Sequence, residues 1–166
     1  MIKLIKGENM NFNNLLSENN VDAIWVTDEK NKRYLTNFSG STCEVIIKKD
    51  KVIFITDGRY KTQIKSELKP GLEVTIITST RGYSKAVKEA LEGCDNIGVE
   101  GNHLSVLAFN DLQKDMDGNI VALDSIFEKL RMVKNEEEIK KIKDEALVLE
   151  IKHLAKIGLE MLGKKI

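Results

Sequence analysis

The sequence predicts an α/β domain with a mixed, mostly parallel sheet, followed by a separate C-terminal helix. Between residues 22 and 123, short apolar runs rich in β-branched residues alternate with helical patterns. Two neighbouring runs, Cys43 to Lys48 and Lys51 to Thr56, are separated only by Lys49-Asp50, which predicts one antiparallel hairpin. From Glu136 onward the apolar residues recur at helical spacing and no strand pattern returns.

The individual elements follow from periodicity and from turn residues. Phe12, Leu15 and Leu16 share one face of an amphipathic helix near the start, and Pro70-Gly71 and Gly93 end two later helices. Strands are expected at 22–27, 43–48, 51–56, 73–78, 96–100 and 119–123, and helical segments at 11–20, 28–34, 59–68, 83–91, 105–114, 124–131 and from 136 past 154.

Composition excludes several classes of function. The 26 basic and 26 acidic residues cancel, whereas non-specific nucleic-acid binding requires a basic surface. No apolar run is long enough to span a bilayer, and residues 1–10 lack a signal-peptide core, whether Met1 or Met10 is the start. Two cysteines, Cys43 and Cys94, cannot form a disulfide framework and lack the C-x-x-C spacing of a zinc or redox site, so we interpret them as buried thiols. The predicted location is the cytoplasm, with no membrane or nucleic-acid partner.

Acidic residues follow several predicted strands, where ligands bind in α/β sheets. Converging carboxylates there would hold Mg²⁺ for phosphoryl chemistry, but Asp at a strand-to-helix junction is also favoured as a cap. We favour capping, and therefore predict no metal site and no cofactor in this chain. His103 and His153 lie far apart without a metal-binding motif, and we interpret both as surface or partly packed side chains. The acids concerned are Asp22, Asp28, Asp57, Glu100 and Asp124.

Four segments carry a resemblance to a known family. Tyr34-Leu-Thr-Asn-Phe-Ser-Gly-Ser41 resembles the Y-L-T-G-F-x-G-S segment of the creatinase and prolidase N-terminal domain, with Asn37 where glycine is common. Thr56-Asp-Gly-Arg-Tyr60 resembles the T-D-x-R-Y segment of that family, and Gly98-Val-Glu-Gly101 resembles its G-x-E segment. The stretch from Leu130 to Ile139 is similar to the R-x-x-K-x-x-x-E-I linker, with Asn135 where serine is common.

This resemblance implies a ribonuclease-H-like topology over residues 1–131. It also implies that residues 132–166 are the linker and first helix of a truncated metallopeptidase domain of the pita-bread fold. In complete relatives that domain holds two divalent ions, Mn²⁺, Co²⁺ or Zn²⁺, and it would be the missing partner of this chain. The implied parent activity is that of an Xaa-Pro aminopeptidase or Xaa-Pro dipeptidase on short proline-containing peptides.

The implied role of this chain is non-catalytic: subunit assembly and restriction of access to the active site. We predict no catalytic residue here, and the substrate-access candidates are Phe38, Ser39, Gly40, Ser41, Asp57 and Arg59. A purely structural role for Asp57 and Arg59, as a cap and an ion pair, is the favoured interpretation of those two. Two alternatives stay open. One is a metal-dependent nuclease or phosphotransferase using Asp57, Glu100 and another acid, and the other is a peptidase-like protein-binding module.

The long C-terminal helix predicts self-association. Ile139, Ile142, Ala146 and Leu149 form one apolar stripe, while Leu147, Ile151 and Leu154 form a second. A helix that is apolar on two sides normally packs against partners on both. We therefore expect a homodimer in which this helix contributes contacts.

Overall fold

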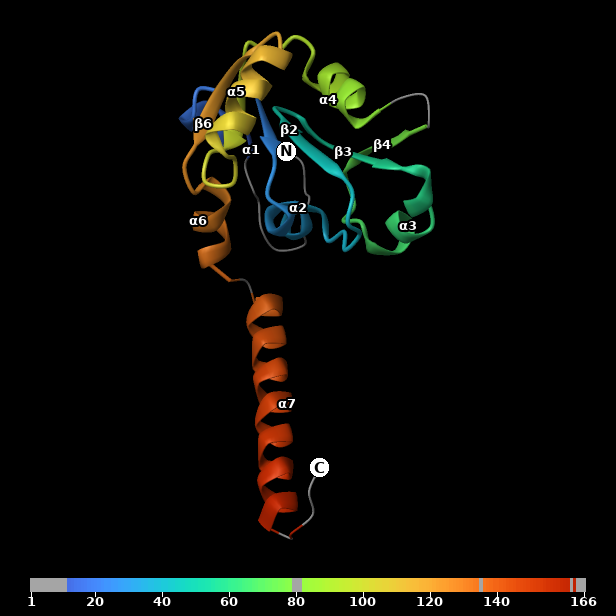
Figure 1. Cartoon of the computed structure of the whole chain (residues 1–166), viewed down its shortest axis with the longest axis vertical. Coiled ribbons are helices and arrows are strands. Elements are labelled where there is room, and N and C mark those ends of the chain that lie inside the picture. The colour runs from blue at the N-terminus through green and yellow to red at the C-terminus, as the bar shows by residue number, and fades with distance from the viewer. Residues whose placement is uncertain (1–11, 79–81, 135, 162, 164–166) are drawn as a thin grey trace. The chain divides into compact units, whose positions relative to one another are not determined.

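The computed structural model describes residues 12–78, 82–134, 136–161 and 163 (Figure 1). The expected start at Met1 or Met10 and the helix cap expected at Asn135 lie outside these residues. The strands are β1 (Ala23–Val26), β2 (Glu44–Lys48), β3 (Lys51–Asp57), β4 (Glu73–Ile77), β5 (Asn96–Glu100) and β6 (Asn119–Leu123). The helices are α1 (Phe12–Glu18), α2 (Glu29–Thr36), η1 (Gly58–Tyr60), α3 (Gln63–Glu67), α4 (Tyr83–Leu91), α5 (Val106–Asp115), α6 (Ile126–Met132) and α7 (Glu136–Met161).

One six-stranded sheet organises the domain, in the order β4-β3-β2-β1-β5-β6. Only β2 runs against the others, because it pairs antiparallel with both β1 and β3, while the remaining pairs are parallel. Lys48 and Lys51 are paired across the hairpin turn, as the sequence predicts. The predicted α/β class with a mostly parallel sheet is confirmed.

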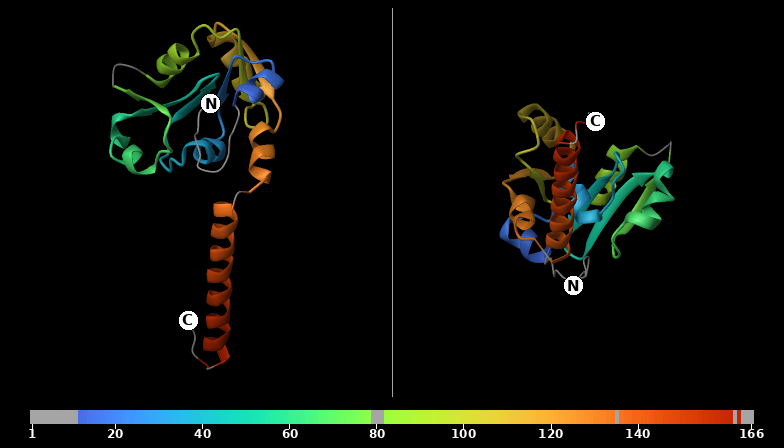
Figure 2. Two further views of the ribbon diagram at one scale, coloured as in Figure 1. Left: turned by 180° about the vertical axis from the view of Figure 1, so that it is seen from behind. Right: turned by 90° about the horizontal axis from the view of Figure 1, so that it is seen from below.

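Both faces of the sheet are buried, and helices lie on each side of it (Figure 2). On one face, Ala86, Val87 and Leu91 of α4 join Ile46 and Ile55 of the sheet in a single apolar cluster. On the other face, α1 packs on β2, and Phe38 packs edge-on against Phe54 of β3. Alternate side chains of each strand therefore reach one core or the other, which explains why the strands are almost uniformly apolar.

Two helical segments differ from the predictions. The helical turn expected at 28–34 is a complete helix to Thr36, because Asp28 caps its first turn and Asn37 ends it in the left-handed conformation, φ 63°. The continuous helix expected at 59–68 is wrong: η1 is a separate 3₁₀ turn capped by Asp57, and α3 begins only at Gln63.

The chain divides into two compact units, Met1–Lys129 and Leu130–Ile166. The second unit contains α7, whose large apolar side chains are exposed along both predicted stripes, including Ile142, Leu149 and Ile151. Among the described helices, none is long and apolar enough to cross a membrane.

Candidate functional site

The candidate residues lie along one edge of the sheet, at the carboxyl ends of the parallel strands. Asp57 ends β3 and Glu100 ends β5, while the segment from Phe38 to Ser41 leads into β2 at the same edge. This is the edge at which α/β sheets bind ligands. The structure therefore brings the loop of residues 38–41 and the segment of residues 57–60 together, and we call these the access loop and the Asp57 turn.

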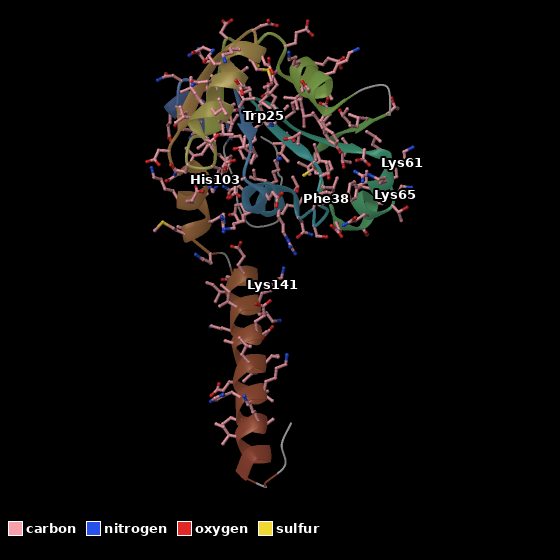
Figure 3. The ribbon with its side chains drawn as sticks, in the orientation of Figure 1. Trp25, Phe38, Lys61, Lys65, His103 and Lys141 are labelled. Atoms are coloured by element: carbon pink, nitrogen blue, oxygen red, sulfur yellow. The ribbon has the colours of Figure 1, made fainter. Side chains whose placement is uncertain are left out.

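Phe38 anchors the access loop, and Figure 3 shows its side chain between α2 and α3. Its ring is 3% exposed and makes edge-to-face contacts with Phe54 and Tyr60, with ring centroids 5.1 and 5.2 Å apart. The Tyr60 hydroxyl lies 3.0 Å from the Ser41 Oγ. Edge-to-face aromatic pairs add to burial, so Phe38 is a structural anchor whose packing joins the two segments.

Gly40 is required for space rather than for a turn. A Cβ at this position would overlap the Phe38 ring and lie 2.8 Å from the Tyr60 Cε1. Gly40 is not among the positive-φ positions of the described chain, so its backbone conformation does not require glycine. Close packing of two aromatic rings excludes even a methyl group there.

Asp57 and Arg59 bind each other. The Arg59 guanidinium donates to both Asp57 carboxylate oxygens at 2.8 and 2.9 Å, and the Arg59 backbone amide also donates to Asp57 at 2.9 Å. These bonds hold the pKa of the Asp57 carboxyl well below its usual range. The Tyr83 hydroxyl donates to Asp57 as well, and burial raises the pKa of Tyr83 to about 12. Asp57 thus caps η1, while the Arg59 side chain remains 72% exposed.

Glu67 of α3 ties the start of the access loop to the neighbouring helix. Its carboxylate accepts hydrogen bonds from the Ser39 amide and hydroxyl and from the Gln63 side chain. The bond from the Ser39 amide is the main reason that the pKa of Glu67 is lowered. Asn37 donates from its side chain to the Glu67 carbonyl. Sequence reasoning missed Glu67, because nothing near it in the sequence indicates a contact nearly thirty residues away.

Two clefts border these segments. A cleft of about 430 Å³ lies between the start of α2 and the access loop, and its wall includes Glu29, Arg33 and Ser41. A second, of about 800 Å³, lies beside the Asp57 turn and is lined by Arg59, Ile76 and other side chains. The Arg59 side chain borders this second cleft and is exposed, but its positive charge is already paired with the Asp57 carboxylate.

The strand-end acids have separate hydrogen-bond partners. Asp28 and Asp57 cap helical segments, as the capping prediction expects, whereas the other three do not act as helix caps. The Asp22 carboxylate accepts from the amides of Asp95 and Asn96, and the Asp124 carboxylate accepts from Asn102 and Ser125. Glu100 is 3% exposed and accepts from the amides of Thr27 and Asp28 and from the side chain of Asn31.

The nuclease alternative requires Asp57 and Glu100 to converge on one ion. Strands β2 and β1 lie between β3 and β5, so the two strands are about 14 Å apart at typical strand spacing. A two-metal site needs its ions roughly 4 Å apart. The geometry therefore gives that alternative no support.

Comparison with known families decides the class of this domain. The model of the Creatinase/Prolidase N-terminal domain matches residues 10–133. The chain belongs to this family. Its sheet order and the single antiparallel strand agree with the ribonuclease-H-like topology that the resemblance implies.

This creatinase/prolidase N-terminal domain is similar to parts of longer peptidases and to a separately solved N-terminal domain. The uncharacterized peptidase YqhT of Bacillus subtilis is 32% identical over 138 residues, which cover 81% of this chain and 38% of YqhT. The Xaa-Pro dipeptidase of Bacillus anthracis is 27% identical with a TM-score of 0.70, covering 78% of this chain and 36% of that chain. The N-terminal domain of the cytoplasmic peptidase PepQ from Mycobacterium tuberculosis is 28% identical with a TM-score of 0.58. The match covers 72% of this chain and 95% of the PepQ domain.

Proposed function

We propose that this chain is the non-catalytic N-terminal domain of an Xaa-Pro metallopeptidase, either an aminopeptidase or a dipeptidase. The supporting observation is the family match over residues 10–133, together with the small share, 36–38%, that the chain spans of YqhT and the Bacillus anthracis dipeptidase. The catalytic part of the parent would hold two divalent ions, Mn²⁺, Co²⁺ or Zn²⁺, and act on short proline-containing peptides.

The access loop and the Asp57 turn would restrict entry to that active site. Phe38 and Gly40 hold the loop through aromatic packing, and Ser39 and Ser41 present hydroxyl groups on it. Arg59 is an exposed charge of this surface. A closely packed loop is suited to limiting peptide length by steric exclusion.

Residues 132–166 would form the linker and the first helix of the catalytic domain. Helix α7 exposes large apolar residues on two sides, which supports packing against further protein surface. In the isolated chain, a second copy would supply that surface. Burying roughly 400 Å² of it at about 25 cal/mol per Å² offers about 10 kcal/mol before the entropy losses of association. A modest homodimer is the expected outcome.

A cytoplasmic location fits the cysteine chemistry. Cys43 and Cys94 are free and buried. Burial raises the pKa of the Cys43 thiol to about 11, so it stays protonated and unreactive. Reduced structural thiols are the usual form in a reducing compartment.

The first test is peptidase activity of the chain alone. We expect no turnover of Xaa-Pro dipeptides or of longer peptides with proline in the second position, with Mn²⁺, Co²⁺ or Zn²⁺ added. Hydrolysis that persists through repurification would contradict a non-catalytic role.

The second test concerns assembly. Light scattering should show a dimer for the full chain at tens of micromolar. It should show a monomer for a chain that ends at Lys134, and that monomer should remain folded. The fluorescence of Trp25, the single tryptophan, reports whether the sheet domain stays folded in both. If the truncated chain still dimerises, the dimer interface lies on the sheet domain and not on α7.

A further inference from the structure

A histidine and two carboxylates from three different elements come together at the carboxyl ends of the parallel strands, apart from the access loop. They are Asp28, which caps α2, His103, in the turn after β5, and Glu128 on α6. His103 Nε2 lies 3.2 Å from Glu128 Oε1 and 3.5 Å from Asp28 Oδ2, and one ligand atom from each residue lies within 4.8 Å of the others. Figure 3 shows His103 near α6, and in this view α2 lies between His103 and Phe38.

Asp28 carries a buried oxygen that lacks a hydrogen-bond donor. Its side chain is 12% exposed, and its Oδ1 accepts from the Lys30 amide as the cap of α2. Its Oδ2 is buried and accepts no hydrogen bond from the described residues. A buried carboxylate oxygen without a donor is strongly unfavourable, and a bound cation is one way in which proteins satisfy such an atom. A single N–H on His103 Nε2 cannot point well at both Asp28 and Glu128, whereas a cation between the three atoms would satisfy all of them.

Two of the three separations between these atoms match a metal site. With ligands at about 2.0–2.2 Å from a tetrahedral zinc ion, neighbouring ligand atoms lie about 3.3–3.5 Å apart. The distances from His103 Nε2 to the two carboxylates, 3.2 and 3.5 Å, are close to that edge length. Imidazole nitrogen with carboxylate oxygen favours Zn²⁺ or a similar transition metal over Mg²⁺ and Ca²⁺, which prefer oxygen alone.

The surroundings orient these ligands. Asn31 donates from its side-chain amide to Glu128 Oε1 at 3.4 Å and to Glu100 Oε1 at 2.5 Å. Hydrogen bonds of this kind fix the direction of a ligating carboxylate. Glu100 has both oxygens occupied by donors, so it adds negative potential behind the cluster without competing as a ligand. Two carboxylates around one imidazole, with a third nearby, favour a divalent cation.

We propose that Asp28, His103 and Glu128 bind one divalent transition-metal ion, with Zn²⁺ preferred. The ion joins the cap of α2, the turn after β5 and the start of α6, and water completes its coordination because His103 and Glu128 are each 35% exposed. This site is separate from the two ions of the proposed catalytic part. It does not depend on the peptidase assignment.

Calorimetry on the chain freed of metal with EDTA tests this, using ZnCl₂ as the titrant. We expect one ion per chain in the micromolar range or tighter, and a higher melting temperature with zinc. His103→Ala, Asp28→Asn and Glu128→Gln should each weaken binding by at least about 10-fold. Asp28→Asn keeps a good helix cap, and His103 is partly exposed, so folding should survive, as circular dichroism will show.

His153→Ala is the matched control, because the chain has two histidines and His153 is exposed on α7. It should leave zinc affinity unchanged. Substituting Co²⁺ should give a visible ligand-field spectrum without thiolate-to-cobalt bands, which separates this site from Cys43 and Cys94. The proposal is overturned if binding is absent at millimolar zinc, if it persists in His103→Ala, or if His153→Ala abolishes it.

Discussion

The sheet unit and helix α7 contain the same kinds of apolar residue, but these residues are buried in the sheet unit and exposed on α7. Ile46 of β2 has no exposed surface, whereas Ile151 of α7 is 57% exposed. In the sheet unit, two helical layers cover both faces, so the apolar strands are buried within that unit. Helix α7 has apolar residues on two sides and no such cover within its own unit. From this difference we predict that the sheet unit folds by itself and that α7 packs against further protein surface.

The strongest test of this contrast exchanges isoleucine for alanine in each region. Ile46→Ala should lower the free energy of unfolding by about 2–5 kcal/mol, because it leaves a cavity in a closely packed core. At concentrations low enough for the chain to be monomeric, Ile151→Ala should change it by less than about 0.5 kcal/mol, since an exposed helical site tolerates alanine well. Urea unfolding followed by Trp25 fluorescence measures both. Equal losses in the two variants would mean that α7 is part of the core.

The same contrast between the sheet unit and α7 can be tested with charged residues, by comparing a buried glutamate with an exposed one. Glu100→Gln should lower the free energy of unfolding by about 1.5–3 kcal/mol, because a neutral amide replaces a buried carboxylate that accepts from Thr27, Asp28 and Asn31. Glu150→Gln, at an exposed position of α7, should stay within about 0.5 kcal/mol. Thermal or urea unfolding at pH 7 compares them. A stable Glu100→Gln variant would show that this network is not needed to hold β1 and β5 together.

The next comparison tests whether the access loop, near the surface, is as closely packed as the core. Gly40→Ala should cost about 1–3 kcal/mol, because the added methyl group overlaps Phe38. Gly58→Ala is the matched control, with its nearest neighbouring atom 4.0 Å from the added Cβ, and it should be neutral or slightly stabilising. Urea unfolding of both variants makes the comparison. If they unfold alike, the loop is loosely packed and does not suit a steric barrier.

The smallest expected effect depends on pH. Because the folded-state pKa of Asp57 is lowered, its charge contributes stability above its unfolded pKa of about 4, and this contribution is lost as pH falls through the folded value. Asp57→Asn should therefore lower the melting temperature at pH 7, and the difference from the wild type should narrow progressively as the pH falls below about 4. Asp144→Asn, exposed on α7, is the control. A gap that widens with acidification would contradict the assignment of Asp57 as a charged cap.

Much of the fold could be predicted because its signals are local. Strand β5 at Asn96–Glu100 and helix α4 at Tyr83–Leu91 match the predicted ranges, since apolar runs and turn residues lie within a few positions of each other. The break between η1 and α3 was missed, because Asp57 caps a single 3₁₀ turn through a geometry that periodicity does not record. The motif containing Asp57 and Arg59 was recognisable, but their mutual ion pair depends on backbone geometry.

The fold class, the family resemblance and the two apolar stripes of α7 could be obtained from the amino-acid sequence alone, because each depends on residue types at short spacing. Which polar groups meet depends instead on the folded arrangement. Asp28, His103 and Glu128 are spread over a hundred positions of the chain, and Glu67 reaches Ser39 from another helix. The parallel strands bring their carboxyl ends to one edge of the sheet, so contacts there depend on strand order rather than on distance along the chain.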